Sequence, residues 1–123
     1  MTDPAGLNGR RVFVVEDETL VSMLIEDILE DFGCTVVGPA ARLDQALTLA
    51  QSEQIDVAIL DVNLAGTRVF PVADILAKRG VPFIFASGYG DLALEGPHVG
   101  RPVVQKPFSP EAIGEILVAA LKG

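Results

Sequence analysis

The feature that most constrains this sequence is its alternation of two kinds of segment. Short apolar runs rich in β-branched residues resemble buried strands. Between them lie longer segments whose apolar residues recur every three or four positions, as in amphipathic helices. Near-continuous apolar strands that alternate with helices are typical of a parallel sheet covered on both faces. The sequence therefore predicts a doubly wound α/β fold.

The apolar runs define five expected strands. They are predicted at residues 11–15, 35–37, 57–60, 82–86 and 103–104. No repeat, low-complexity segment or linker divides the chain, and 123 residues suit one compact domain. We expect a single domain over residues 1–123, with its core at about 11–121 and no effector domain.

A helix is expected after each strand, but the helical pattern is weak after the fourth strand. The apolar stripes are Leu20, Val21, Leu24, Ile25, Ile28, Leu29 and Phe32; Leu43, Ala46, Leu47 and Ala50; Val69, Val72, Ala73 and Leu76; and Ile113, Ile116, Leu117, Ala120 and Leu121. Ser109 followed by Pro110 and Glu111 is a typical helix start. A further helix belongs in residues 88–100, but Gly96, Pro97 and Gly100 limit it to about two turns, so this segment should be short or mobile.

The charge and hydropathy of the chain argue against a nucleic acid or a membrane as its binding partner. The formal net charge of −8 argues against direct contact with a nucleic-acid backbone, which requires clustered lysines and arginines. No apolar run approaches the roughly 18 residues that a membrane span needs, and no secretory signal precedes the first strand. We therefore expect no membrane partner and a cytoplasmic location. The single cysteine, Cys34, excludes an internal disulfide and a multi-cysteine metal site.

Polar residues of complementary chemistry follow four of the expected strands. Glu16 and Asp17 come after the first strand, Asp61 after the third, Ser87 after the fourth and Lys106 after the fifth. Ligands of an open parallel sheet bind at the carboxyl ends of its strands, where these side chains would meet. Each residue alone has an ordinary explanation, as a helix cap, a turn residue or a surface lysine. Together they predict a site.

The combination suits phosphoryl chemistry. Carboxylates from different strand ends can share a hard cation such as Mg²⁺, which would neutralise the repulsion between Asp61 and a phosphoryl group. Asp61 can act as a carboxylate nucleophile. Lys106 can place a positive charge on one phosphoryl oxygen, and Ser87 can donate a hydrogen bond to another.

The segments VVEDE, ILDVNL, FASGYG and QKPF resemble, in this order, the signature segments of bacterial response-regulator receiver domains. The resemblance implies a flavodoxin-like, CheY-like sheet with strand order 2-1-3-4-5. It also implies that Mg²⁺ (or Mn²⁺) is bound by Asp17, Asp61 and the backbone carbonyl of Asn63, with Glu16 acting through a water. In this family the Lys106–Pro107 peptide is usually cis.

The same resemblance implies a function in two-component signalling. Asp61 would accept a phosphoryl group from a sensor histidine kinase or a histidine phosphotransfer protein, with Ser87 and Lys106 assisting. Such a domain is not an enzyme in the usual sense, although slow self-dephosphorylation is expected. Its output would be altered binding to another protein or onward phosphoryl relay.

The sequence departs from the family pattern on the fifth strand. Many receivers carry a Tyr or Phe there that swings inward, and the matching position is Val103. PFIFASGYG resembles the FATGUY subgroup of standalone receivers, in which Tyr89 follows Ser87 by two residues. Tyr89 is either a substitute for the missing ring or a partly exposed loop aromatic. His98, the only histidine, is interpreted as a loop residue.

Three other functions fit the sequence less well. A phosphatase of the haloacid-dehalogenase type needs a second Asp two residues after the nucleophile, where this chain has Asn63, and its motifs come in another order. A degenerate receiver would act only as a phosphorylation-independent protein-binding module, but the acid, hydroxyl and lysine set is complete. A dinucleotide-binding domain is disfavoured because no glycine-rich turn follows the first strand.

Overall fold

The computed structural model describes residues 6–88, 94 and 98–122. Within them, the main sheet has five parallel strands in the order β2-β1-β3-β6-β7. These strands are β1 (Arg11–Val15), β2 (Thr35–Ala40), β3 (Val57–Asp61), β6 (Phe83–Ser87) and β7 (Val103–Gln105). This is the predicted doubly wound topology, because β6 and β7 are the fourth and fifth strands of the main sheet.

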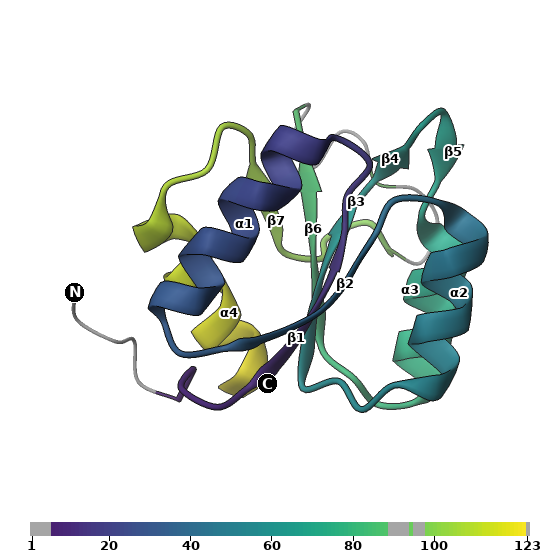
Figure 1. Cartoon of the computed structure of the whole chain (residues 1–123). Coiled ribbons are helices and arrows are strands. Elements are labelled where there is room, and N and C mark those ends of the chain that lie inside the picture. Colours follow the sequence, from purple (N-terminus) through teal and green to yellow (C-terminus); the bar gives the residue numbers. More distant parts are fainter. Residues whose placement is uncertain (1–5, 89–93, 95–97, 123) are drawn as a thin grey trace.

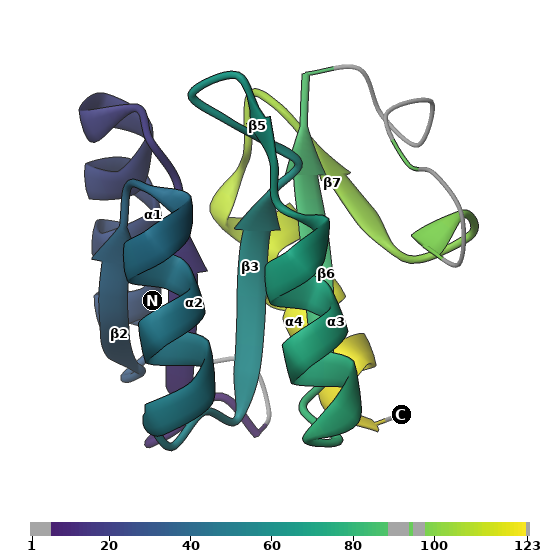
Figure 2. The same ribbon diagram turned by 90° about the vertical axis from the view of Figure 1, so that its right-hand side faces the viewer.

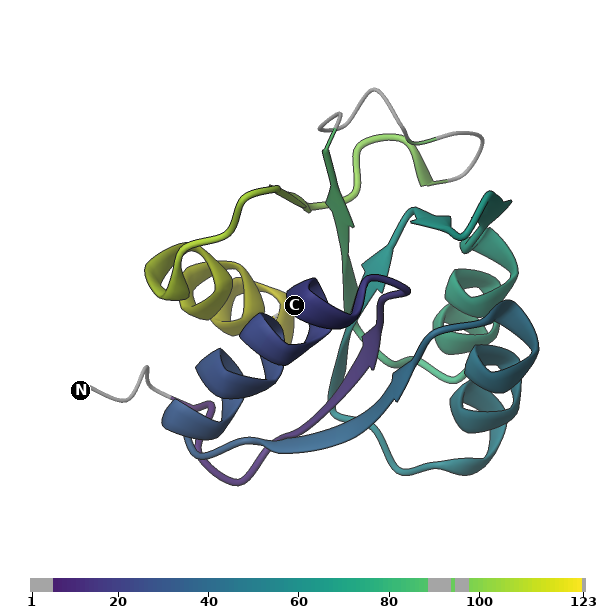
Figure 3. The same ribbon diagram turned by 45° about the horizontal axis from the view of Figure 1, so that its top comes forward.

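In the described part of the chain, helices cover both faces of the sheet, as Figure 1 and Figure 3 show. Helices α1 (Thr19–Asp31) and α4 (Pro110–Lys122) lie on one face. Helices α2 (Leu43–Ser52) and α3 (Phe70–Lys78) lie side by side on the other (Figure 2). Every residue of β3 and β6 is buried, because both strands lie inside the sheet and both of their faces are covered. The predicted apolar runs are therefore the centre of the core.

A short antiparallel hairpin, not predicted from the sequence, follows β3 at the carboxyl edge of the sheet (Figure 2). It consists of β4 (Asn63–Leu64) and β5 (Thr67–Arg68). Ala65 and Gly66 turn between them with φ angles of 51° and 85°. Two consecutive positive φ angles are the pattern of a tight hairpin turn whose twist matches that of the strands.

The apolar stripe predicted for α1 is wrong at two positions. The buried residues of α1 are Ser22, Ile25, Ile28 and Leu29. Leu20 and Leu24 are instead 82% and 44% exposed, and Met23 beside them is 52% exposed. At about 100° of rotation per residue, these three side chains turn away from the stripe that faces the sheet. The first turns of α1 therefore present an apolar surface to solvent.

The segment between β6 and β7 is described only in part. Residues 89–93 and 95–97, where a short or mobile helix was expected, lie outside the described residues. Elsewhere, each helix of the described chain is too short or too polar to span a bilayer.

The start of α4 allows a direct test of the fold. The hydroxyl of Ser109 accepts a hydrogen bond from the backbone N–H of Ala112 at 3.1 Å, which is the predicted N-cap. Ser109→Ala should lower the free energy of unfolding by about 1 kcal/mol, because this N–H loses its acceptor. Urea denaturation measures the change. Ser109→Asp keeps a capping oxygen and should retain most of the stability, so an equal loss in both variants would contradict the cap.

Candidate functional site

The parallel strands bring the predicted polar residues to one edge of the sheet. Asp61 and Ser87 are the last residues of β3 and β6, and both are buried, at 5% and 3% exposure. Glu16 follows β1 directly and is 2% exposed. Lys106 follows β7, and its backbone N–H donates to the carbonyl of Ser87. The edge therefore gathers acids, a hydroxyl and a lysine from four different strands.

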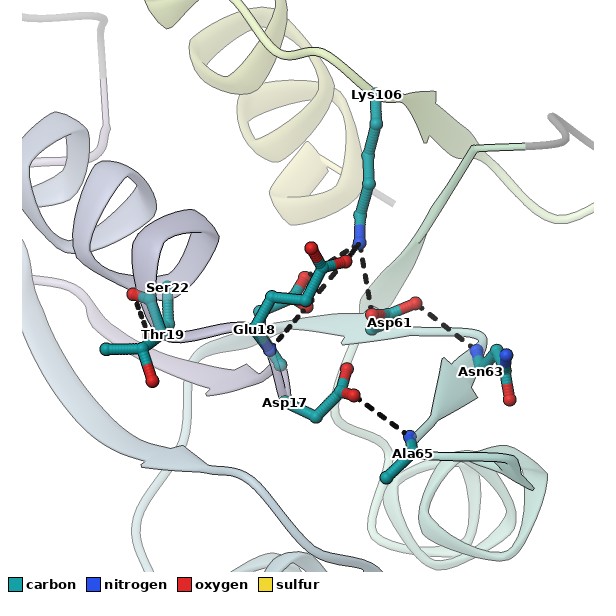
Figure 4. Close-up of polar contacts among 9 residues, drawn as sticks. Asp17, Glu18, Thr19, Ser22, Asp61, Asn63, Ala65 and Lys106 are labelled. Carbon is teal, nitrogen blue, oxygen red and sulfur yellow. Dashed lines mark hydrogen bonds and ion pairs between the residues drawn. The ribbon is translucent and has the colours of Figure 1, made fainter.

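The ammonium group of Lys106 lies at the centre of this cluster (Figure 4). Its Nζ is 3.1 Å from Asp61 Oδ2 and 3.1 Å from Glu16 Oε1. A third carboxylate, that of Glu18, has its Oε1 3.5 Å from Nζ. Glu18 was not predicted to be a site residue, although it belongs to the same Glu16-Asp17-Glu18 run.

Backbone N–H groups fix the orientation of three acids. Asn63 donates to Asp61 Oδ1 at 3.2 Å, and Glu18 donates to Glu16 Oε2 at 3.2 Å. Ala65, at the turn of the β4-β5 hairpin, donates to Asp17 Oδ2 at 3.2 Å (Figure 4). The hairpin thereby connects the Asp61 loop to the loop after β1. The geometry of the acids depends on these backbone bonds as well as on Lys106.

Burial and mutual repulsion shift the proton equilibria of the site. Burial, together with the hydrogen bond and charge of Asp61, raises the pKa of Glu16 from 4.5 to about 7. Burial would lower the pKa of Lys106, but the carboxylates of Asp61 and Glu16 outweigh it and raise that pKa. The site thus favours the protonated forms of Lys106 and Glu16.

The donor set fits a hard divalent cation. Among the described residues, the carboxylates of Glu16, Glu18 and Asp61 form a group whose oxygens lie within 4.8 Å of one another. Glu16 Oε1 is buried without a hydrogen-bond partner in the described chain, since its approach to Lys106 lacks hydrogen-bond geometry. Oxygen ligands of this kind suit Mg²⁺. The ligand set expected from the sequence, Asp17, Asp61 and the Asn63 carbonyl, stays a prediction.

The structure tests some of the predictions made for residues around the fifth strand. The Lys106–Pro107 peptide is cis, as the resemblance implied. Val103 is half-buried, and Tyr89 lies outside the described residues. His98 lies in the connection between β6 and β7, and it is buried, at 4% exposure. Its ring stacks on Phe70 with the centroids 5.0 Å apart, and its Nε2 lies 3.1 Å from Asp74 Oδ1.

Comparison with known proteins identifies relatives of the whole domain. Residues 12–118 match the family model described as the response regulator receiver domain. The solution structure of SdrG from Sphingomonas melonis Fr1 is 40% identical, with a TM-score of 0.82 over 94% of this chain and 98% of that one. A second SdrG structure, titled the BeF3-activated conformation, is 39% identical with a TM-score of 0.77 and covers 98% and 99% of the two chains.

A curated relative is longer than this chain. The phyllosphere-induced regulator PhyR of Methylorubrum extorquens is 30% identical over 117 residues, which are 89% of this chain and 43% of that protein. The chain spans about half the length of the curated relatives it matches.

The raised pKa of Glu16 predicts how stability depends on pH. The folded protein holds this proton up to about pH 7, whereas the unfolded chain releases it near 4.5, so stability should fall as pH rises across this window. Glu16→Gln should remove this loss and stabilise the metal-free protein at pH 8 by roughly 1–3 kcal/mol. Urea denaturation between pH 5 and 8 measures it.

Glu18→Gln is the matched control, because it removes an acid from the same edge at an exposed position. If wild type and Glu16→Gln show the same change of stability between pH 5 and 8, the buried proton of Glu16 is not responsible.

Proposed function

The chain belongs to the family of response regulator receiver domains, and we propose that its Asp61 accepts a phosphoryl group from a histidine side chain of a donor protein. The observation that carries the proposal is the position of Asp61. Its carboxylate ends a fully buried strand and contacts a lysine that also pairs with a second buried acid, at the edge where ligands of this fold bind.

The proposed reaction moves the phosphoryl group between two nucleophiles. The bond from phosphorus to the histidine nitrogen breaks, and a bond from phosphorus to a carboxylate oxygen of Asp61 forms. The nitrogen keeps the electron pair of the broken bond, and the ring leaves as a neutral imidazole because its other nitrogen carries a proton. The hydrogen bond from the Asn63 N–H holds the carboxylate of Asp61 in a fixed orientation, which favours in-line transfer.

The surrounding residues would stabilise the product. Lys106 can exchange a carboxylate partner for a phosphoryl oxygen without moving far, since its Nζ already lies 3.1 Å from Asp61 Oδ2. The hydroxyl of Ser87 would donate a hydrogen bond to another phosphoryl oxygen. Asp17, Asp61 and the Asn63 carbonyl would hold Mg²⁺ or Mn²⁺, with Glu16 acting through a water; the cation supplies charge neutralisation for the transfer. Slow self-dephosphorylation is the only hydrolysis expected.

Support for activation by phosphorylation comes from a relative. SdrG, which this chain matches over nearly its whole length, has a structure titled the BeF3-activated conformation. Beryllofluoride is a phosphoryl mimic, so we infer that this chain responds to phosphate in the same pocket. The response would be altered protein binding or onward relay. A cytoplasmic location and a single-domain protein stay predictions.

We also propose that the apolar surface of α1, formed by Leu20, Met23 and Leu24, is where the donor protein docks. These side chains are exposed on the first two turns of a helix that begins directly after the acidic loop of the site. A donor histidine must approach that edge to reach Asp61. The exposed Asp27 on the same helix favours a donor surface with apolar anchors and flanking basic residues. A sensor kinase or a histidine phosphotransfer protein would fit.

Phosphorylation of the chain tests the main proposal. Incubation with acetyl phosphate and Mg²⁺ should add one phosphoryl group that persists, as measured by intact-mass spectrometry. Asp61→Asn should abolish the addition because the amide is not a nucleophile, whereas Asp44→Asn, an exposed acid on α2, should be labelled like wild type. A folded Asp61→Asn variant that still gains one phosphate would sink the assignment. A degenerate receiver would gain none even as wild type.

The docking surface is tested by comparing two donors. Leu20→Ser combined with Met23→Ser should slow transfer from a cognate histidine donor about tenfold, because apolar contacts in the encounter are lost. Labelling by acetyl phosphate should not change, since this small donor does not use the helix. Val99→Ser is the control, because Val99 is exposed at 67% on another part of the molecule. Equal slowing with both donors would show damage to the site rather than to docking.

A further inference from the structure

The carboxylate of Glu18 stands at the mouth of the Asp61 site. Its side chain is 63% exposed, and its Oε1 is 3.5 Å from the Nζ of Lys106. Glu16 and Asp61, which contact the same ammonium group, are buried. Figure 4 shows Glu18 turned toward Lys106 and Asp61. Of the three acids around the lysine, Glu18 is the one that an incoming ligand meets from solvent.

Helix capping does not account for this position. Glu18 is the N-cap residue of α1, a position where a shorter side chain such as Ser or Asp commonly caps the helix. The Glu18 carboxylate makes no such bond. Its backbone is fixed on both sides, because its N–H donates to Glu16 Oε2 and its carbonyl accepts from the N–H of Ser22. The backbone thus holds Glu18 where its side chain reaches the lysine instead of the helix end.

The carboxyl groups beside Lys106 outnumber its single ammonium group. Glu16 Oε1 is buried and lies 3.1 Å from the Lys106 Nζ, but this contact lacks hydrogen-bond geometry. One lysine serves three carboxyl groups. A further carboxylate at the mouth makes a cation more strongly attracted and an anion more strongly repelled.

We propose that Glu18 is a specificity-determining residue of the Asp61 site, which strengthens Mg²⁺ binding and selects against strongly anionic phosphodonors. The proposal rests on the proposed function of Asp61. Glu18 acts in two ways: its charge repels the donor, and its contact with Lys106 competes with the phosphoryl oxygen for the ammonium group. Both effects increase with the negative charge of the donor. A phosphohistidine whose ring is protonated carries one negative charge fewer than an acyl phosphate dianion, and is therefore penalised less.

Two small donors of different charge provide the test. Near pH 7 acetyl phosphate is a dianion and phosphoramidate a monoanion, and both deliver the same phosphoryl group to Asp61. Glu18→Gln should raise the ratio of the acetyl phosphate rate to the phosphoramidate rate by roughly threefold at low salt. It should also weaken Mg²⁺ binding by roughly threefold in a calorimetric titration. Both effects should shrink at high salt.

Glu30→Gln is the matched control, because it makes the same substitution at an exposed position about 18 Å further along α1. It should leave both the donor ratio and Mg²⁺ affinity near the wild-type values. An unchanged ratio in Glu18→Gln, or an equal change in Glu30→Gln, overturns the inference while leaving phosphorylation of Asp61 intact. If wild type is not labelled by either donor, the proposed function fails. The Mg²⁺ titration then decides the role of Glu18, and unchanged affinity overturns it.

Discussion

One ammonium group balances the acids at the carboxyl edge of the sheet. Lys106 contacts carboxylates that come from the ends of β1 and β3, two of which are buried. Buried charges are tolerated only when paired, so the acidic edge depends on the position of this lysine. Its backbone position in turn depends on β7, because the Lys106 N–H continues the β6-β7 pairing by donating to Ser87. The charge balance of the site therefore depends on the pairing of β7 with β6, which places Lys106.

The β4-β5 hairpin adds a second constraint on the same acids. Its turn residue Ala65 donates to Asp17, while Asn63 at its start donates to Asp61. The loops after β1 and β3 therefore share one small structural unit. A tight turn with two positive φ angles has little conformational freedom. The backbone N–H groups of this hairpin therefore hold the carboxylates of Asp17 and Asp61 in fixed positions. Acids oriented in advance lose less entropy when they bind a cation.

The doubly wound fold and the edge that carries the site could be predicted because both follow from the alternation of strands and helices, whereas the strand order was implied by the family resemblance. The exposed Leu20 and Leu24 could not, since an apolar residue in a helix is assigned to the core unless its angular position is compared with that of the buried stripe. The β4-β5 hairpin has strands of two residues and an Ala-Gly turn, which carry no strong signal. The contact of Glu18 with Lys106 depends on a side-chain direction that spacing does not determine.

The site consists of a rigid frame and a few adjustable groups. The frame includes the backbone at the end of β6, which is bonded on both sides: Val62 donates to Ala86, and Lys106 donates to Ser87. Asp61 and Glu16 are buried and anchored by backbone N–H groups. The side chains of Lys106 and Glu18 are longer and more exposed, at 19% and 63%. When the charge at the site changes, these two side chains can therefore exchange ion-pair partners without movement of a strand. The frame resists displacement. The free energy of phosphoryl binding at the site therefore depends mainly on whether Lys106 pairs with carboxylate or with phosphoryl oxygens.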